Sequence, residues 1–177
     1  RRCVRPRYPK EGLLQMAGIA GIPSTEKWQS DDTQFVAAEG DFREFENLQD
    51  VEIVYLHRWL DERSRIVSYD IEKRVVTMER PSMSPLEGRG EIRLADYYLE
   101  NIFEEMKNPG EWYLDCGAGM LYYVPLEGEE PKNTEVRAPR ALQLLALKGD
   151  PDGKRYVEFL RFEGITFEHT DWRHPDV

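Results

Sequence analysis

The sequence predicts an all-β fold: an antiparallel, sandwich-like domain with one or two short helices, followed by partial rungs of a β-helix. Three observations predict it. Residues 108–125 form one hairpin pattern, residues 63–78 form a second, and short apolar segments separated by small bends follow residue 141. Alternation of apolar and polar residues between Gly- and Pro-containing turns is typical of strands.

The hairpin pattern at residues 108–125 is the predicted centre of the fold. Its first strand places Trp112 and Leu114 on one face and Tyr113 on the other, because side chains alternate along a strand. The segment Cys116–Gly119 contains two glycines and predicts the reversal. Since both faces are bulky and apolar, we expect other parts of the chain to cover the hairpin on both sides.

The second hairpin joins strands at residues 63–70 and 74–78, which alternate around a tight turn at residues 71–73. A further strand is predicted at residues 51–57. Asp41 is a fair N-cap for one or two helical turns, because Glu44 stands at the capping-box position. The remaining expectations are an extended lead-in at 1–12, a strand at 13–20, a polar segment at 24–40 with a short strand at Phe35–Val36, a loop at 80–93, and strand or helix at 96–106.

The last part of the chain has a different pattern. Short strands are predicted at residues 142–147, 157–159 and 165–167, with small bends between them. Such a pattern is typical of β-helix rungs, of which we count at most two. A stacked-repeat core needs about three units, so this region is expected to require more chain. The predicted organisation is a lead-in segment (1–12), a β-sandwich-like domain (13–140) and the start of β-helix rungs (141–177).

The composition excludes several function classes. The chain has 177 residues, a hydrophobic fraction of 40% and a net charge of −10, so it is globular and repels nucleic-acid phosphates. No apolar segment approaches the roughly 20 residues that span a bilayer, and no signal peptide is expected in this chain. Because it opens without Met, we expect a mature form or an excised piece. No metal or nucleotide motif occurs, so neither a metal nor a cofactor is predicted.

Five residues are candidates for binding a substrate. His57 and Trp59 stand two apart on a predicted strand, so both project to the same side, and an imidazole beside an indole suits a sugar. His169 and Asp171 share a face in the same way, and Trp172 follows them. The alternative interpretations are a packed strand end with a satisfied histidine for the first pair and a capped rung end for the second.

A resemblance to a known family rests on residues 101–125. They read N-x-F-E-x-x-x-x-P-G-E-W-Y-L-D, then a glycine turn, then L-Y-Y-x-P. This pattern resembles the inserted β-domain of right-handed parallel β-helix enzymes of glycoside hydrolase family 141, which are of fucosidase or xylanase type. Cys116 departs from the pattern, and the chain is several times shorter than those enzymes. The other segments that fit, in the same order, are 7–9, 54–59, 97–103 and 166–172.

The resemblance implies a function. The chain would be an accessory domain of a secreted, cell-surface or periplasmic protein, helping to wall a carbohydrate-binding cleft. It would not be catalytic alone, because the family's catalytic carboxylates lie on the β-helix proper. The implied partners are a plant-type polysaccharide or oligosaccharide and the remaining β-helix, and an exported parent would permit a Cys3–Cys116 disulfide.

Two other functions stay open. One is a purely structural or interaction domain that covers a β-helix edge, which buried Trp59 and Trp112 side chains would favour. The other is an autonomous carbohydrate-binding module, which a planar trio of exposed tryptophans would favour.

Overall fold

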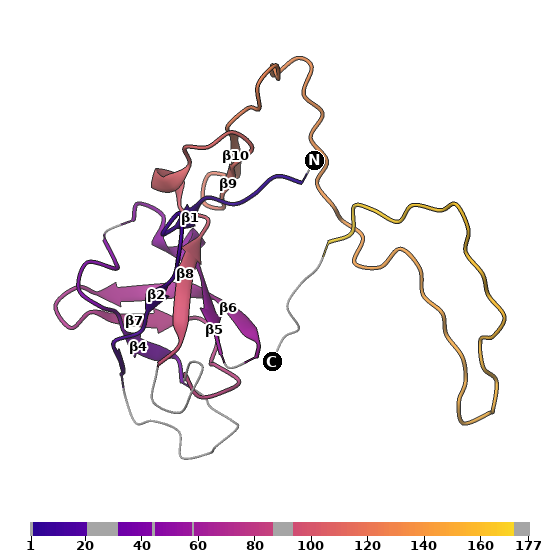
Figure 1. Cartoon of the computed structure of the whole chain (residues 1–177), viewed down its shortest axis with the longest axis horizontal. Helices are drawn as coiled ribbons and strands as arrows, with labels where there is room; N and C mark the ends of the chain where they lie inside the picture. Colours follow the sequence, from indigo (N-terminus) through magenta and orange to yellow (C-terminus); the bar gives the residue numbers. More distant parts are fainter. Residues whose placement is uncertain (1, 21–31, 44, 58, 87–93, 172–177) are drawn as a thin grey trace. The chain divides into compact units, whose positions relative to one another are not determined.

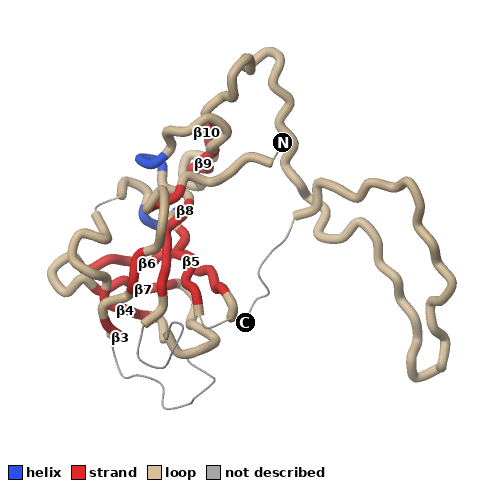
Figure 2. Tube along the Cα trace, viewed as in Figure 1, coloured by secondary structure: helices blue, strands red, loops and turns tan. Residues whose placement is uncertain are grey.

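A computed structural model of the chain describes residues 2–20, 32–43, 45–57, 59–86 and 94–171. The described residues confirm the predicted all-β fold, with mostly antiparallel pairing. Helical structure among them is limited to two 3-10 turns, η1 (Leu48–Asp50) and η2 (Phe103–Glu105) (Figure 2). The chain divides into two compact units, residues 1–129 and 130–177.

The first unit is built around one large sheet (Figure 1). Its order in the described part is β1-β8-β5-β6-β7-β4-β3, and β2 also pairs with β8. β5 is central because both of its neighbours pair with it along its whole length. The strands are β1 (Arg7–Tyr8), β2 (Leu14–Gln15), β3 (Gly18–Ile19), β4 (Gln34–Val36), β5 (Glu52–Leu56), β6 (Asp61–Asp70), β7 (Val75–Met78) and β8 (Asp96–Glu100).

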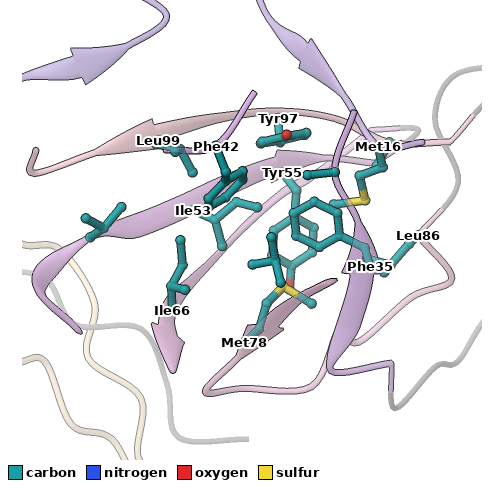
Figure 3. Packing of buried hydrophobic residues seen from close by; sticks show 14 of the residues in the cluster. Met16, Phe35, Phe42, Ile53, Tyr55, Ile66, Met78, Leu86, Tyr97 and Leu99 are labelled. Carbon is teal, nitrogen blue, oxygen red and sulfur yellow. The ribbon is translucent and has the colours of Figure 1, made fainter. Parts of the chain in front are cut away.

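The hydrophobic core lies on one face of this sheet (Figure 3). Ile53 and Tyr55 of β5 alternate onto it, as do Tyr97 and Leu99 of the neighbouring strand, and all four are essentially inaccessible to solvent. Phe35 packs edge-on against Tyr97, with ring centroids 5.2 Å apart. Burying a side chain of this size stabilises the fold by about 1.5–3 kcal/mol.

The hairpin of residues 108–125 is not the centre of the fold, contrary to the prediction. It forms a separate two-stranded sheet of β9 (Trp112–Asp115) and β10 (Met120–Tyr123). Tyr113 is buried, but Met120, Leu121 and Tyr122 are exposed. Apolar residues on both faces of a strand do not specify what covers them, and here only one side is covered.

Two local predictions fail for the same reason. The single strand expected at residues 13–20 is split into β2 and β3, which pair with different strands, β8 and β4. The helix expected after Asp41 is not formed at residues 42–43 and 45, and Glu44, the expected capping-box residue, lies outside the described residues. Phe42 and Phe45 are buried in the core as predicted. Two-residue strands and single turns are decided by tertiary partners and not by local sequence.

The second unit contains no strand within residues 130–171, so the strands expected at 142–147, 157–159 and 165–167 are not formed. Its backbone pairing consists of a parallel bridge between Ala141 and Thr170 and an antiparallel bridge between Asp150 and Arg155. Many large apolar side chains are exposed here, and Phe159 is 99% exposed. Rungs of a parallel β-helix pair with the turns above and below them, and these segments have no such partners in the described chain.

The two cysteines are both free and exposed. Cys3 precedes Val4, which pairs with Glu111 at the start of the β9–β10 hairpin, whereas Cys116 follows the last residue of β9. Since both thiols are free, the Cys3–Cys116 bridge is not formed in this structure.

Candidate functional site

His57 lies at the end of β5, where the alternation that buries Ile53 and Tyr55 also turns the imidazole inward. The residue is 7% exposed. Its Nδ1 lies 3.1 Å from the carbonyl oxygen of Pro85, and its Nε2 lies 2.7 Å from a carboxylate oxygen of Glu62. Both ring nitrogens thus face hydrogen-bond acceptors inside the protein.

Glu62 connects His57 to the loop that follows β7. Its second carboxylate oxygen accepts the backbone N–H of Met83 at 3.0 Å and the hydroxyl of Tyr55 at 3.3 Å. Burial would raise the pKa of Glu62, but the hydrogen bonds from His57 and from the Met83 N–H outweigh burial and leave that pKa below its ordinary value. We call Tyr55, His57, Glu62 and Ser82 the His57 network.

Ser82 brings a hydroxyl to this network, so the network contains the residue types of a serine hydrolase. The arrangement is different. Ser82 Oγ lies 3.4 Å from His57 Nε2, the same nitrogen that faces Glu62, whereas a catalytic triad uses the two ring nitrogens for the two partners. The Ser82 hydroxyl is fully buried and donates to the carbonyl oxygen of Ser84 at 2.5 Å. These contacts suit a structural role and not a nucleophile.

Trp59 has a different environment from His57, although the sequence predicted a shared face. β5 ends at Leu56, and the His57 N–H donates to the carbonyl of Leu60 at 2.8 Å, which closes a tight turn. Trp59 stands on this turn and is 70% exposed. Strand alternation no longer applies on this turn, so the His57 side chain enters the core whereas the Trp59 side chain points to solvent.

The second candidate pair belongs to the second unit. His169 has a φ of 61° and its Nδ1 lies 3.2 Å from a carboxylate oxygen of Glu168, a residue that the sequence argument did not select. The backbone N–H of Asp171 donates to the carbonyl of Ala141 at 2.9 Å. Trp172 lies outside the described residues.

The outer face of the sheet carries a row of charges that sequence reasoning missed. Arg7, Glu100, Glu52 and Arg65 are neighbours across four strands. Arg63 lies 2.5 Å from Glu100 and 3.7 Å from Glu52, so it bridges the two carboxylates. A signal was available in β6, where charged residues recur at alternate positions, but only the register between strands brings them beside Glu52 and Glu100.

Glu52 in this row is held in the ionised form. Burial would raise the pKa of Glu52, but Arg5 and Arg63 outweigh it and lower that pKa. Every described carboxyl group with a clearly shifted pKa is shifted downward. They are Glu52, Glu62, Asp70, Glu111, Glu129, Glu135 and Asp150. A glycosidase's general acid needs the opposite, a raised pKa.

No group of three or more His, Cys, Asp or Glu side chains in the described residues could hold a metal ion. The same residues contain no helix with the length and apolar character needed to cross a membrane.

Comparison with known proteins gives one structural likeness. No protein-family model matches the chain, and no curated protein matches it. A solved structure described as "Glycoside hydrolase" matches with a TM-score of 0.66 and 23% sequence identity. The match covers 96% of this chain and 30% of that chain, so the chain spans under a third of the neighbour's length. At this level of identity, the match shows that the two share a fold.

Proposed function

We propose that the chain is the accessory β-domain of a secreted protein related to glycoside hydrolases, together with the first turn of that protein's right-handed parallel β-helix. In this proposal, it helps to wall a carbohydrate-binding cleft in polysaccharide degradation and is not catalytic alone. The shared fold supports this, because 96% of the chain matches 30% of a much longer structure described as a glycoside hydrolase.

The observation that carries the proposal is the parallel bridge between Ala141 and Thr170. The Asp171 N–H donates to the Ala141 carbonyl, so the chain leaves residue 141 and returns alongside it in the same direction. A segment that comes back parallel to its own start closes one turn of a solenoid. The exposed apolar residues of this turn, such as Leu144 and Phe162, are the kind that a following turn would bury.

The pKa pattern supports a non-catalytic role for this part of the protein. Glycoside hydrolysis requires one carboxyl group that stays protonated and another that is ionised. In the described residues, the shifted carboxyl groups are all more acidic than usual. Glu52 and Glu100 are adjacent, but Glu52 is paired with Arg5 and Arg63, and Glu100 with Arg63.

A second candidate function is a purely structural domain that covers a β-helix edge. The burial of His57 favours it, because a histidine bound on both nitrogens is not open to a sugar. The exposure of Trp59 favours contact with carbohydrate instead.

Hydrolysis assays test the proposal. The chain alone should not release product from aryl fucosides or xylan, whereas the full-length protein should act on a glycoside. Trp59→Ala in the full-length protein should raise KM and leave the melting temperature unchanged. Turnover by the chain alone would contradict the proposal, since it would require a catalytic carboxylate pair within residues 1–177.

A further inference from the structure

We propose that Glu62 is a positioning residue: its carboxylate joins the turn that carries Trp59 to the loop that carries Met83, and so fixes an apolar platform for the face of a sugar ring. The platform consists of Trp59, Leu60 and Met83. The sugar assignment rests on the proposed function, whereas the role of Glu62 in fixing the platform rests on its contacts.

The largely buried carboxylate of Glu62 joins two separate segments of the chain. The Glu62 side chain is 12% exposed. One carboxylate oxygen of Glu62 lies 2.7 Å from His57 Nε2, beside the turn. The other oxygen accepts the backbone N–H of Met83, which lies 21 positions later in the sequence, at 3.0 Å. Hydrogen bonds to an ionised carboxylate are stronger than neutral ones.

Every platform residue is adjacent to the His57 network. Leu60 accepts the His57 N–H through its carbonyl, Met83 donates its own N–H to Glu62, and Trp59 lies between His57 and Leu60 on the same turn. Yet the platform side chains face solvent, with 70% of Trp59, 40% of Leu60 and 58% of Met83 exposed. Polar contacts below the surface therefore fix the backbone from which three large apolar side chains project.

A sugar ring is the ligand that suits this platform. A flat indole accepts the C–H face of a pyranose, and an aromatic side chain on a fixed backbone has few torsion angles to order on binding. The exposed Asp61 follows Leu60 and offers carboxylate oxygens to sugar hydroxyls. A platform of three side chains is small compared with the roughly 800 Å² per partner of a stable protein interface. The size and the adjacent carboxylate favour carbohydrate over a protein partner.

A double-mutant cycle in the full-length protein tests whether Glu62 acts through Trp59. The probe is xylohexaose together with a panel of fucose-containing oligosaccharides, and the measurement is Kd by calorimetry. We expect Trp59→Ala to raise Kd about tenfold or more and Glu62→Gln to raise it severalfold. In the double variant, Glu62→Gln should raise Kd by a smaller factor than it does when Trp59 is present, because only Leu60 and Met83 then remain to be positioned.

Two further variants keep the test independent of folding. Met83→Ala retains the backbone N–H that Glu62 binds, and should still raise Kd. Glu111→Gln removes a comparably buried carboxylate in the β9–β10 hairpin, and should lower the melting temperature without changing Kd.

The inference is overturned if Trp59→Ala leaves Kd unchanged, if the effect of Glu62→Gln is the same with and without Trp59, or if the unmodified protein binds none of the sugars. The accessory-domain proposal fails separately, through hydrolysis by the chain alone.

Discussion

The ammonium group of Lys10 lies 2.7 Å from a carboxylate oxygen of Glu111, and this contact attaches the N-terminal segment to the start of the β9–β10 hairpin. The other oxygen of Glu111 accepts the backbone N–H groups of Lys107 at 2.8 Å and Asn108 at 2.9 Å. The Glu111 side chain is 6% exposed. One carboxylate thus joins the lead-in segment, the loop after η2 and β9.

We predict that Glu111 makes stability depend on pH in acid. Burial alone would raise its pKa, but the hydrogen bonds from Asn108, Lys10 and Lys107 lower it to about 2 from an ordinary 4.5. A group with a lowered folded pKa stabilises the fold above its unfolded pKa, so this stability is present above pH 4.5 and is lost as pH falls toward 2. The contribution of Glu111 to the free energy of unfolding is at most about 3 kcal/mol. Urea denaturation between pH 2 and 7 measures it.

The matched variants are Glu111→Gln, which should flatten this part of the pH profile, and Glu127→Gln, which should not because Glu127 is exposed. An unchanged profile in Glu111→Gln would show that other carboxyl groups cause the acid sensitivity.

We predict that Phe35→Ala destabilises the chain much more than Trp112→Ala. Phe35 is fully buried against Tyr97, and truncating such a residue costs about 3–5 kcal/mol. Trp112 is only half-buried, in a hairpin outside the main sheet, and the Arg5 guanidinium lies 5.7 Å from its ring centroid. Truncation of Trp112 should therefore lower the free energy of unfolding by about 2 kcal/mol or less. If urea denaturation shows that both variants lose the same free energy of unfolding, the β9–β10 hairpin contributes to the core as much as the main sheet does.

The sequence predicts the strands of the main sheet better than the centre of the fold. Residues 51–57, 63–70 and 74–78 alternate clearly, and β5, β6 and β7 form there. The hairpin at 108–125 lies outside the main sheet, because its apolar pattern does not specify which parts of the chain pack against it. The rungs after residue 141 were expected as strands, but strand formation there depends on pairing partners.

The site could be predicted only in part. Histidine 57 was found from its place on a strand, but the burial of its ring depends on Glu62 and Pro85, which lie elsewhere in the sequence. A signal for Glu62 did exist. Once the turn at residues 57–60 is recognised, the antiparallel register places Glu62 opposite Tyr55, beside His57. Pro85 lies 28 residues from His57 and has no comparable sequence signal.

We predict that His57→Ala lowers stability by about 3 kcal/mol, because removing the imidazole leaves the largely buried Glu62 carboxylate without the hydrogen-bond partner that His57 provides at one of its oxygens. His169→Ala is the matched control. Its side chain is 43% exposed and its partner Glu168 is 60% exposed, so the loss should be under about 1 kcal/mol. Chemical denaturation measures both. A His57→Ala variant as stable as the unmodified chain would show that the His57 network does not fasten the loop to the turn.

The last prediction concerns the second unit, whose apolar side chains have no cover within residues 130–171. Phe159 is 99% exposed, and Phe162 and Phe167 are about half exposed while packing edge-on against each other, with centroids 6.2 Å apart. Exposed apolar patches of this kind favour association. We expect the isolated chain to self-associate at micromolar concentration, and Phe159→Asp to weaken that association measurably in sedimentation velocity. Ile71→Asp is the control, since Ile71 is 61% exposed on the turn between β6 and β7 and should not affect association. A monomer at all concentrations, or an equal effect of both variants, would mean that the apolar residues of the second unit do not form an interface, and would weaken the proposal that a further turn of β-helix covers them.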